Sequence, residues 1–101
     1  MMTVLTTTRL RAGSEAQWDA AMRERFESAQ GMQGWVSGQL LTPEDDPQSR
    51  VIVGTWNSRE DWMTWHDHPA FLDKRAKLED LESGPNVTRW CTVVADARAD
   101  I

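Results

Sequence analysis

Residues 51–81 read VIVGTWNSREDWMTWHDHPAFLDKRAKLEDL, and this stretch decides the fold because a strand pattern runs directly into a helix pattern. Residues 51–56 are mostly β-branched and end in an aromatic, which is typical of a short strand buried on both faces. Ser58 followed by Asp61 resembles a capping box with Asp in place of Glu. We therefore expect a helix to begin at Arg59.

The predicted helix is interrupted by Asp67-His68-Pro69. The residue before a proline is disfavoured in the α region, and proline is favoured at the first position of a helix, so a second helix is expected to begin at Pro69. Before the break, Trp62, Trp65 and His66 share one face because they are spaced at i, i+3 and i+4. The apolar stripe of the second helix consists of Phe71, Leu72, Leu78 and Leu81.

The N-terminal part of the chain predicts a strand followed by a longer helix. Residues 3–10 are rich in β-branched residues, which favour a strand. Ser14 with Gln17 three residues later is a second capping-box pattern, and the helix it starts is expected to end at Gly31. One face of this helix repeats Trp18, Met22, Phe26 and Ala29, with Arg25 alongside. This spacing is typical of a helix that packs with one side on a sheet.

Two further strands are predicted at residues 35–41 and 87–95. Gly38, inside the first of them, is expected to mark a bulge or a close approach of another group. The acidic stretch 43–49 is expected to be a solvated loop that lets its flanking strands pair as a hairpin. Residues 96–101 predict a frayed tail.

The element order is thus β-α-β-β-α-β, and a chain of 101 residues is expected to form one domain over residues 1–101. The most economical arrangement is a four-stranded antiparallel sheet with both helices on one face. The opposite sheet face would then carry apolar residues without cover, and a second copy of the chain is its expected partner. The sequence therefore predicts an α+β homodimer.

Composition and charge exclude several classes of protein. The net charge is -5 and the eleven basic residues are scattered, which argues against nucleic-acid binding. No apolar run approaches the roughly 20 residues of a membrane span, and the N-terminus lacks a signal-peptide pattern, so a cytoplasmic protein is expected. No metal-ligand spacing, phosphate loop or nucleophile elbow is present, so no metal site is expected.

The candidate site is defined by tryptophan, of which the chain has six. One interpretation is that Trp35, Trp56, Trp62 and Trp65 line a flat slot for a polycyclic aromatic molecule. The alternative is that they only pack the core. His66, beside Trp65 on the inward face, is the candidate catalytic base near neutral pH. Its alternative role is that of a helix-terminal histidine that interacts with the last carbonyl groups, with His68 exposed before the proline.

The same residues resemble a known family. The strand-to-helix signature of the antibiotic biosynthesis monooxygenase family is similar to TWNS at 55–58, Asp61-Trp62, Trp65 and PAF at 69–71, and the resemblance extends to Gly34-Trp35 through Leu41. It covers about two-thirds of the chain. The resemblance implies a ferredoxin-like subunit with a four-stranded antiparallel sheet, paired into a homodimeric α+β barrel.

The resemblance also implies an activity, that of a cofactor-independent monooxygenase acting on an aromatic or quinone-like small molecule. Such an enzyme needs neither metal nor flavin, because a protein base helps form a substrate carbanion that reduces dioxygen itself. The expected partners are therefore a second subunit, a small aromatic molecule and dioxygen, without a cofactor. The alternative is a non-catalytic dimer that binds an aromatic ligand or haem.

The chain departs from the family pattern at polar positions. The strand asparagine of the anthrone oxygenases corresponds to Ile52, and their helix arginine corresponds to Glu79. In the haem-degrading branch, the histidine that ligates iron falls at Lys74 or Arg75, and the first-strand asparagine falls at Thr6 or Thr8. These departures argue against family-type haem oxygenation.

Overall fold

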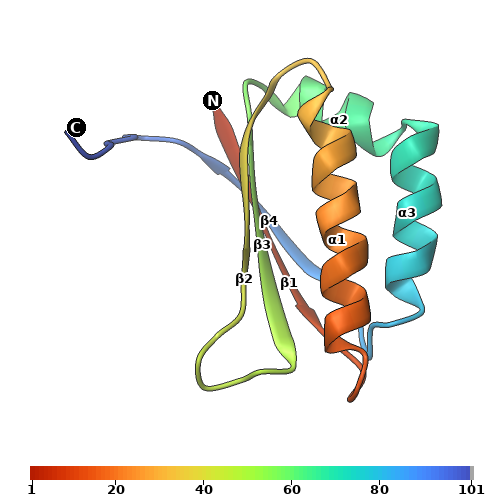
Figure 1. Cartoon of the computed structure of the whole chain (residues 1–101). Helices are drawn as coiled ribbons and strands as arrows, with labels where there is room; N and C mark the ends of the chain where they lie inside the picture. Colours follow the sequence, from red (N-terminus) through yellow and green to blue (C-terminus); the bar gives the residue numbers. More distant parts are fainter. Residues whose placement is uncertain (101) are drawn as a thin grey trace.

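A four-stranded antiparallel sheet in the order β2-β3-β1-β4 carries all the helices on one face (Figure 1). The computed structural model describes residues 1–100, so the last residue of the predicted tail, Ile101, lies outside the described residues. The elements are β1 (Met2–Arg9), α1 (Glu15–Gln30), β2 (Trp35–Leu41), β3 (Ser49–Trp56), α2 (Arg59–His66), α3 (Pro69–Glu79) and β4 (Val87–Thr92). The ferredoxin-like α+β fold is confirmed, with the second helix divided into α2 and α3.

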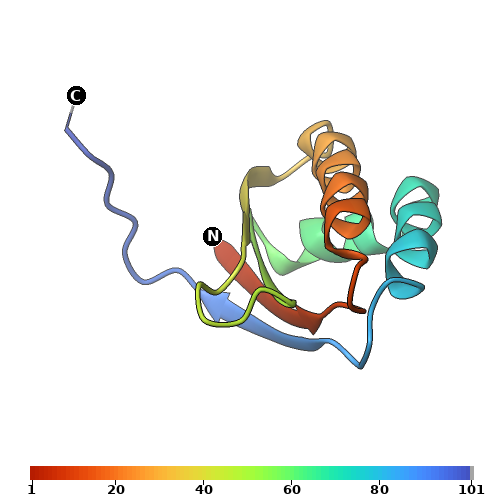
Figure 2. The ribbon, with the colours of Figure 1, turned by 60° about the horizontal axis from the view of Figure 1, so that its bottom comes forward.

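The last strand is shorter than the sequence suggested. β4 ends at Thr92 instead of residue 95, because from Val93 onward the chain leaves the sheet as an extended tail. Figure 2 shows this tail running away from the body of the molecule, on the side opposite the helices. Within residues 1–100, no helix has the length and apolar character required to cross a membrane.

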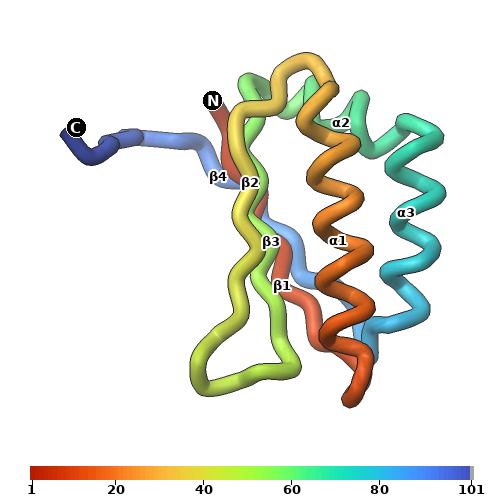
Figure 3. The backbone as a smooth tube through the Cα atoms, in the orientation of Figure 1, coloured from red at the N-terminus to blue at the C-terminus, as the bar shows by residue number. Residues whose placement is uncertain are grey.

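Local signals set the start of α2 and the break before α3. The hydroxyl oxygen of Ser58 accepts the backbone N–H of Asp61 at 3.2 Å, which confirms the expected cap. At the break, His68 is the N-cap of α3, because its Nδ1 accepts the backbone N–H of Ala70 at 3.1 Å. The chain therefore turns sharply between the two helices, as the backbone tube in Figure 3 shows.

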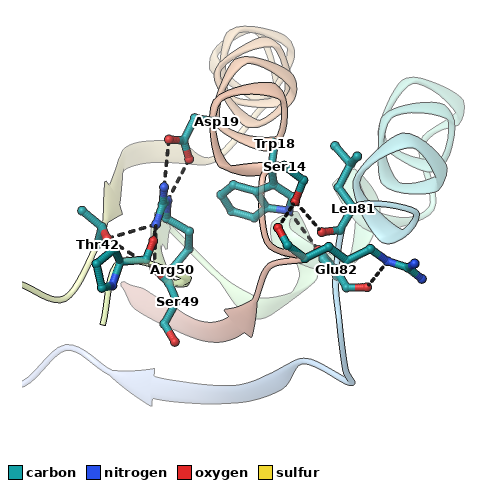
Figure 4. Close-up of polar contacts among 10 residues, drawn as sticks. Ser14, Trp18, Asp19, Thr42, Ser49, Arg50, Leu81 and Glu82 are labelled. Atoms are coloured by element: carbon teal, nitrogen blue, oxygen red, sulfur yellow. Dashed lines mark hydrogen bonds and ion pairs between the residues drawn. The ribbon is translucent and has the colours of Figure 1, made fainter. Parts of the chain in front are cut away.

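The capping box expected at Ser14 does not form. The Ser14 hydroxyl instead donates to the backbone carbonyl oxygen of Arg11 at 2.6 Å and to that of Leu81 at 3.0 Å (Figure 4). The Leu81 carbonyl belongs to the segment that leaves α3, and Trp18 Nε1–H donates to a Glu82 carboxylate oxygen in the same segment at 3.1 Å. Arg11 Nε also donates to the Glu82 carbonyl oxygen at 3.2 Å, so three side-chain hydrogen bonds join the exit of α3 to the entry of α1.

The core lies between the sheet and the helices in two clusters. One cluster buries Met2, Val4, Ala29, Trp56, Trp65 and Phe71 around α2, and the other buries Leu10, Trp18, Met22 and Leu78 where α1 meets α3. The predicted stripe on α3 is only partly correct, because Leu72 is 49% exposed. This helix packs along α1 and not on the sheet, so fewer of its faces are covered.

The start of β2 contains the irregularity that Gly38 suggested. A register shift lies between Trp35 and Ser37, and the Trp35 indole folds back over Gly38. A Cβ at Gly38 would lie 2.6 Å from the Trp35 ring, which is closer than van der Waals contact permits. Both the bulge and the close approach are confirmed.

A buried arginine fastens the β2–β3 hairpin to α1. Arg50 Nε and Nη2 donate to the two carboxylate oxygens of Asp19 at 2.8 and 3.1 Å (Figure 4). Its Nη1 donates to the Thr42 hydroxyl oxygen and to the Pro47 and Ser49 carbonyl oxygens. A bidentate pair of this kind fixes orientation as well as distance, so the acidic loop is held in place at its base.

The sheet face turned away from the helices is mixed in polarity. Leu5 and Val53 are cross-strand partners on this face, and Val51 lies beside them on β3. Thr3 and Thr55, one step further along, hydrogen-bond to each other through their hydroxyl groups at 2.8 Å. The strand expected to be buried on both faces therefore has Val51, Val53 and Thr55 partly exposed in the single chain.

Replacing Gly34 by alanine should destabilise the fold more than replacing Gly13. Both glycines have positive φ, at 88° and 85°, so a side chain at either position costs about 1 kcal/mol or more in backbone strain. An added Cβ at Gly34 would also overlap the carboxyl group of Asp61, whereas at Gly13 it meets nothing. We expect about 1 kcal/mol of lost unfolding free energy for Gly13→Ala and about 3 kcal/mol for Gly34→Ala, measured by urea titration. Equal losses would contradict the close contact with Asp61.

Candidate functional site

A cleft of ≈ 520 Å³ lies between α2 and α3 on one side and β1 and β4 on the other. It remains open because α3 packs on α1, and the strand residues beneath it, such as Thr6 and Thr88, are too small to fill the space. The segment 82–86 bounds it after α3. Its aromatic and charged lining side chains are Trp18, Arg25, Trp62, His66, Phe71, Arg75, Glu79, Glu82 and Trp90.

One wall of the cleft is a continuous row of stacked groups. The Arg25 guanidinium carbon lies 4.3 Å from the centroid of the Phe71 ring, and the Phe71 centroid lies 4.1 Å from that of His66. The row continues from His66 to Trp62 at 3.8 Å and from Trp62 to Trp90 on β4 at 5.5 Å. These side chains give the cleft an aromatic wall that can bind a flat, apolar ligand.

The hydrogen bond of His66 fixes its tautomer. Nδ1 lies 2.8 Å from the backbone carbonyl oxygen of Trp62, and a carbonyl can only accept, so Nδ1 carries the proton and Nε2 keeps its lone pair. The pKa of His66 is lowered from 6.5 to about 4, mainly by burial; the Trp62 carbonyl opposes this shift, and the charges of Arg25 and Arg75 contribute to it. The imidazole is therefore neutral at pH 7 and can accept a proton, although it is a weaker base than a solvated histidine.

Charged groups gather where α1 faces α3. Burial lowers the pKa of Arg25 to about 10, with Arg75 adding to this shift and Glu82 opposing it, so the guanidinium is charged at neutral pH. Burial also raises the pKa of Glu82, against the lowering effect of the N–H donated by Trp18. Arg75 is largely exposed and pairs with Glu79 at 2.8 Å.

The four tryptophans expected in a slot occupy different places. Trp62 lines the cleft next to His66. Trp56 and Trp65 are buried below it, around a small void of ≈ 40 Å³ that Trp62 and His66 also border. Trp35 lines neither space and packs edge-on against Trp56, with ring centroids 5.2 Å apart. The structure thus brings Trp62 and His66 together in the cleft, with Trp56 and Trp65 beneath them.

Three side chains of the cleft, Arg25, Phe71 and Trp90, were not singled out as site residues from the sequence. Side chains alternate along a strand, so Trp90 lies on the same face of β4 as Thr88, the face turned toward the helices. This alternation could have identified Trp90 as a cleft residue. Arg25 completes an inward series with Trp18, Met22 and Ala29 at i, i+4, i+7 and i+11. A charged residue within such a series is a signal for a polar group directed into the interior.

Two other hollows, of ≈ 310 and ≈ 430 Å³, lie on the outer sheet face beside the tail. They are bordered by Thr3, Ser37, Thr55, Asp96 and Arg98 and have no aromatic wall. Across residues 1–100, no three His, Cys, Asp or Glu side chains are grouped as metal ligands would be. The cleft between sheet and helices is therefore the candidate site.

The fold and the cleft define a ferredoxin-like α+β domain with a ligand-sized space between its sheet and its helices. Residues 1–77 match the family model described as antibiotic biosynthesis monooxygenase, and the chain belongs to that family. No curated protein matches the chain in sequence.

Solved structures show the same fold. A Nitrosomonas europaea protein proposed to be an antibiotic biosynthesis monooxygenase is 16% identical, with a TM-score of 0.88 over 92% of this chain and 89% of that one. SnoaB, a cofactor-independent oxygenase from Streptomyces nogalater, is 18% identical, with a TM-score of 0.85 over 94% of each chain. Rv0793 from Mycobacterium tuberculosis is 18% identical, with a TM-score of 0.85 over 96% of this chain and 98% of that one. At these identities the likeness shows the fold alone.

The imidazole of His66 should titrate near pH 4 in the folded protein. The unfolded chain binds a proton at His66 from about pH 6.5 downward, whereas the folded chain does so only near pH 4, so the free energy of unfolding falls as the pH drops through this window. Above pH 6.5 the residue has no such effect. An NMR titration of the two histidine rings measures the midpoint, and a His68→Gln variant assigns the signals.

The stability effect is measured by urea unfolding of the parent and of a His66→Gln variant at several pH values. Carboxylates also titrate in this range, so the informative quantity is the difference between the two proteins. The parent should lose stability relative to the variant between about pH 6.5 and 4. A constant difference across this window would show that His66 is not shielded from water.

Proposed function

We propose that the chain is a cofactor-independent monooxygenase that oxidises an aromatic or quinone-like small molecule in the cleft. The observation that carries this proposal is His66, a neutral imidazole of fixed tautomer within an aromatic wall of a ≈ 520 Å³ cleft. A space of this volume suits a molecule of two or three fused rings. Membership of the antibiotic biosynthesis monooxygenase family supports the reaction class.

In the proposed reaction, His66 Nε2 takes a proton from an activated CH₂ group of the substrate. The resulting carbanion transfers its electrons to dioxygen, a carbon–oxygen bond forms, and loss of water leaves a carbonyl group. The balance is one CH₂ group and one O₂ giving one C=O group and one H₂O. The substrate is the reductant, so no metal, flavin or other cofactor is required.

The proposed binding residues have distinct roles. Trp62, next to His66, would stack on the substrate ring. Trp56 and Trp65 would form the floor beneath the ring, and Trp35 would support Trp56 from behind. Burial of Trp65 at 3% exposure and of Trp56 at 2% makes both suited to shape the cavity and not to move with the ligand.

The proposal is tested by oxygen uptake with a panel of anthrones, which carry the activated CH₂ group that the proposed step requires. We expect the purified protein, treated with a chelator and free of flavin, to consume oxygen and form the corresponding quinone. Replacing His66 by alanine should lower kcat by about 100-fold, because a positioned general base contributes about 10²–10⁴. A His68→Ala variant is the control, since His68 caps α3 and does not line the cleft.

Two outcomes of this test would redirect the proposal. Full activity in His66→Ala would remove His66 from the mechanism. Saturable binding of the same compounds without oxygen uptake by the parent would favour the non-catalytic dimer that holds an aromatic ligand, and a haem titration with a Soret shift would identify haem as that ligand.

The proposed enzyme is a homodimer that pairs through its outer sheet faces. Leu5, Val51 and Val53 form the centre of an apolar patch on this face, and Leu41 and Val87 beside them are 44% and 63% exposed. Covering this patch with a second copy would remove it from water.

Sedimentation equilibrium should give twice the chain mass of 11.5 kDa. A Val53→Lys variant should sediment as a folded monomer or associate much more weakly, because a lysine at the patch centre would be buried without a partner. Leu72→Lys is the matched control, since Leu72 is exposed on α3, away from the sheet. Monomeric parent protein would contradict the dimer.

A further inference from the structure

Arg25 is a half-buried cation of the cleft that has no acceptor of its own. Its guanidinium carries five N–H donors, and none of them makes a hydrogen bond to any residue of the described chain 1–100. Its close contact is with the face of Phe71, at 4.3 Å. By contrast, the side chains of Arg9, Arg11, Arg50 and Arg75 each donate a hydrogen bond to an oxygen acceptor.

The position of Arg25 is internal to the cleft. It borders both the ≈ 520 Å³ cleft and the small void beneath it, as do His66 and Trp62. The nearest acid that influences it, Glu82, already accepts the N–H of Trp18 at 3.1 Å. The other cation of this region, Arg75, is directed to Glu79 near the surface. The donors of Arg25 are therefore available to a ligand.

We infer that Arg25 binds the negatively charged oxygen of the substrate, and that the substrate is an aromatic molecule whose acidic hydroxyl or enolisable carbonyl carries this charge on oxygen. The inference rests on the proposed function and extends it by naming a further catalytic residue and the ionisable group it recognises. A flat ring placed along Trp62 and His66 would direct one edge toward Phe71 and Arg25, at the end of the stacked row.

The chemistry of the cleft requires such a partner. When His66 takes a proton from the substrate, an imidazolium and a carbanion are formed together beside the aromatic wall of the cleft. If the carbon is next to a carbonyl, its charge is delocalised onto the carbonyl oxygen as an enolate. A guanidinium at that oxygen stabilises the anion through charge-assisted hydrogen bonds. His66 then accepts the proton, and Arg25 stabilises the anion that the same proton transfer produces.

The test uses 2-hydroxy-1,4-naphthoquinone, whose anion has a distinct visible absorption, and its 2-methoxy ether, which has nearly the same shape and cannot ionise. Binding is measured by absorption titration without turnover. We expect the parent to bind the anion about tenfold or more tightly than the ether. Arg25→Gln should lose this preference while its affinity for the ether stays within about twofold.

Matched variants separate a binding role from a structural one. Arg23→Gln removes an exposed arginine from the same helix and should leave both affinities unchanged. Arg25→Lys keeps the charge and should keep part of the preference for the anion. The midpoint of urea unfolding identifies any variant that fails to fold, in which case Arg25→Lys and the salt dependence of anion binding by the parent decide the question. Equal affinity of folded Arg25→Gln and parent for the anion would overturn the inference.

The outcomes also distinguish this inference from the proposed function. Anion binding that depends on Arg25, in a protein that never consumes oxygen, would leave the inference standing and reject the monooxygenase. Oxygen uptake that persists at the parental rate in Arg25→Gln would reject the role of Arg25 and leave the monooxygenase standing.

Discussion

The position of α3 is the constraint on which the rest of the site depends. This helix packs along α1, with Leu78 buried beside Trp18 and Met22, and it does not lie on the strands. The hydrogen bonds from Ser14 and Trp18 to the segment after α3 hold it there. Because the helix is kept away from the strands, and because those strands present small side chains below it, the interior of the domain is not filled. The cleft therefore results from the packing of α3 on α1.

This geometry also sets the electrostatics of the cleft. Burial favours the neutral form of a group that can lose its charge, whereas a group that cannot lose its charge remains charged. His66 is the first kind, with its pKa lowered to about 4, and Arg25 is the second. A neutral acceptor of protons and a fixed positive charge thus stand on the same stacked row, separated by Phe71. Their complementary properties follow from one cause, which is burial.

The sequence predicted those features that depend on neighbouring residues and missed those that depend on distant ones. The cap at Ser58 and the break before Pro69 are local, and both were predictable. The role of Ser14 was not, because its acceptor at Leu81 is 67 residues away. Periodicity placed Trp62, Trp65 and His66 on one face of the helix, but whether an inward residue meets another side chain or open space depends on where α3 lies. Arg25 was expected alongside the inward face of α1, but the groups that its guanidinium meets belong to α2, α3 and β4, which are distant in the sequence.

The fold of Trp35 over Gly38 has a consequence for how this chain can vary. The Trp35 ring occupies the volume that a side chain at position 38 would need, so positions 35 and 38 cannot both carry a large side chain. The ring also supports Trp56, which lies under the cleft. A relative with a side chain at position 38 must therefore have a smaller residue at position 35. Loss of the Trp35 ring would shift Trp56, and with it the floor of the cavity. Substitutions at positions 35 and 38 should be correlated among homologues. Such pairs could change the shape of the cavity from β2, a strand that does not line it.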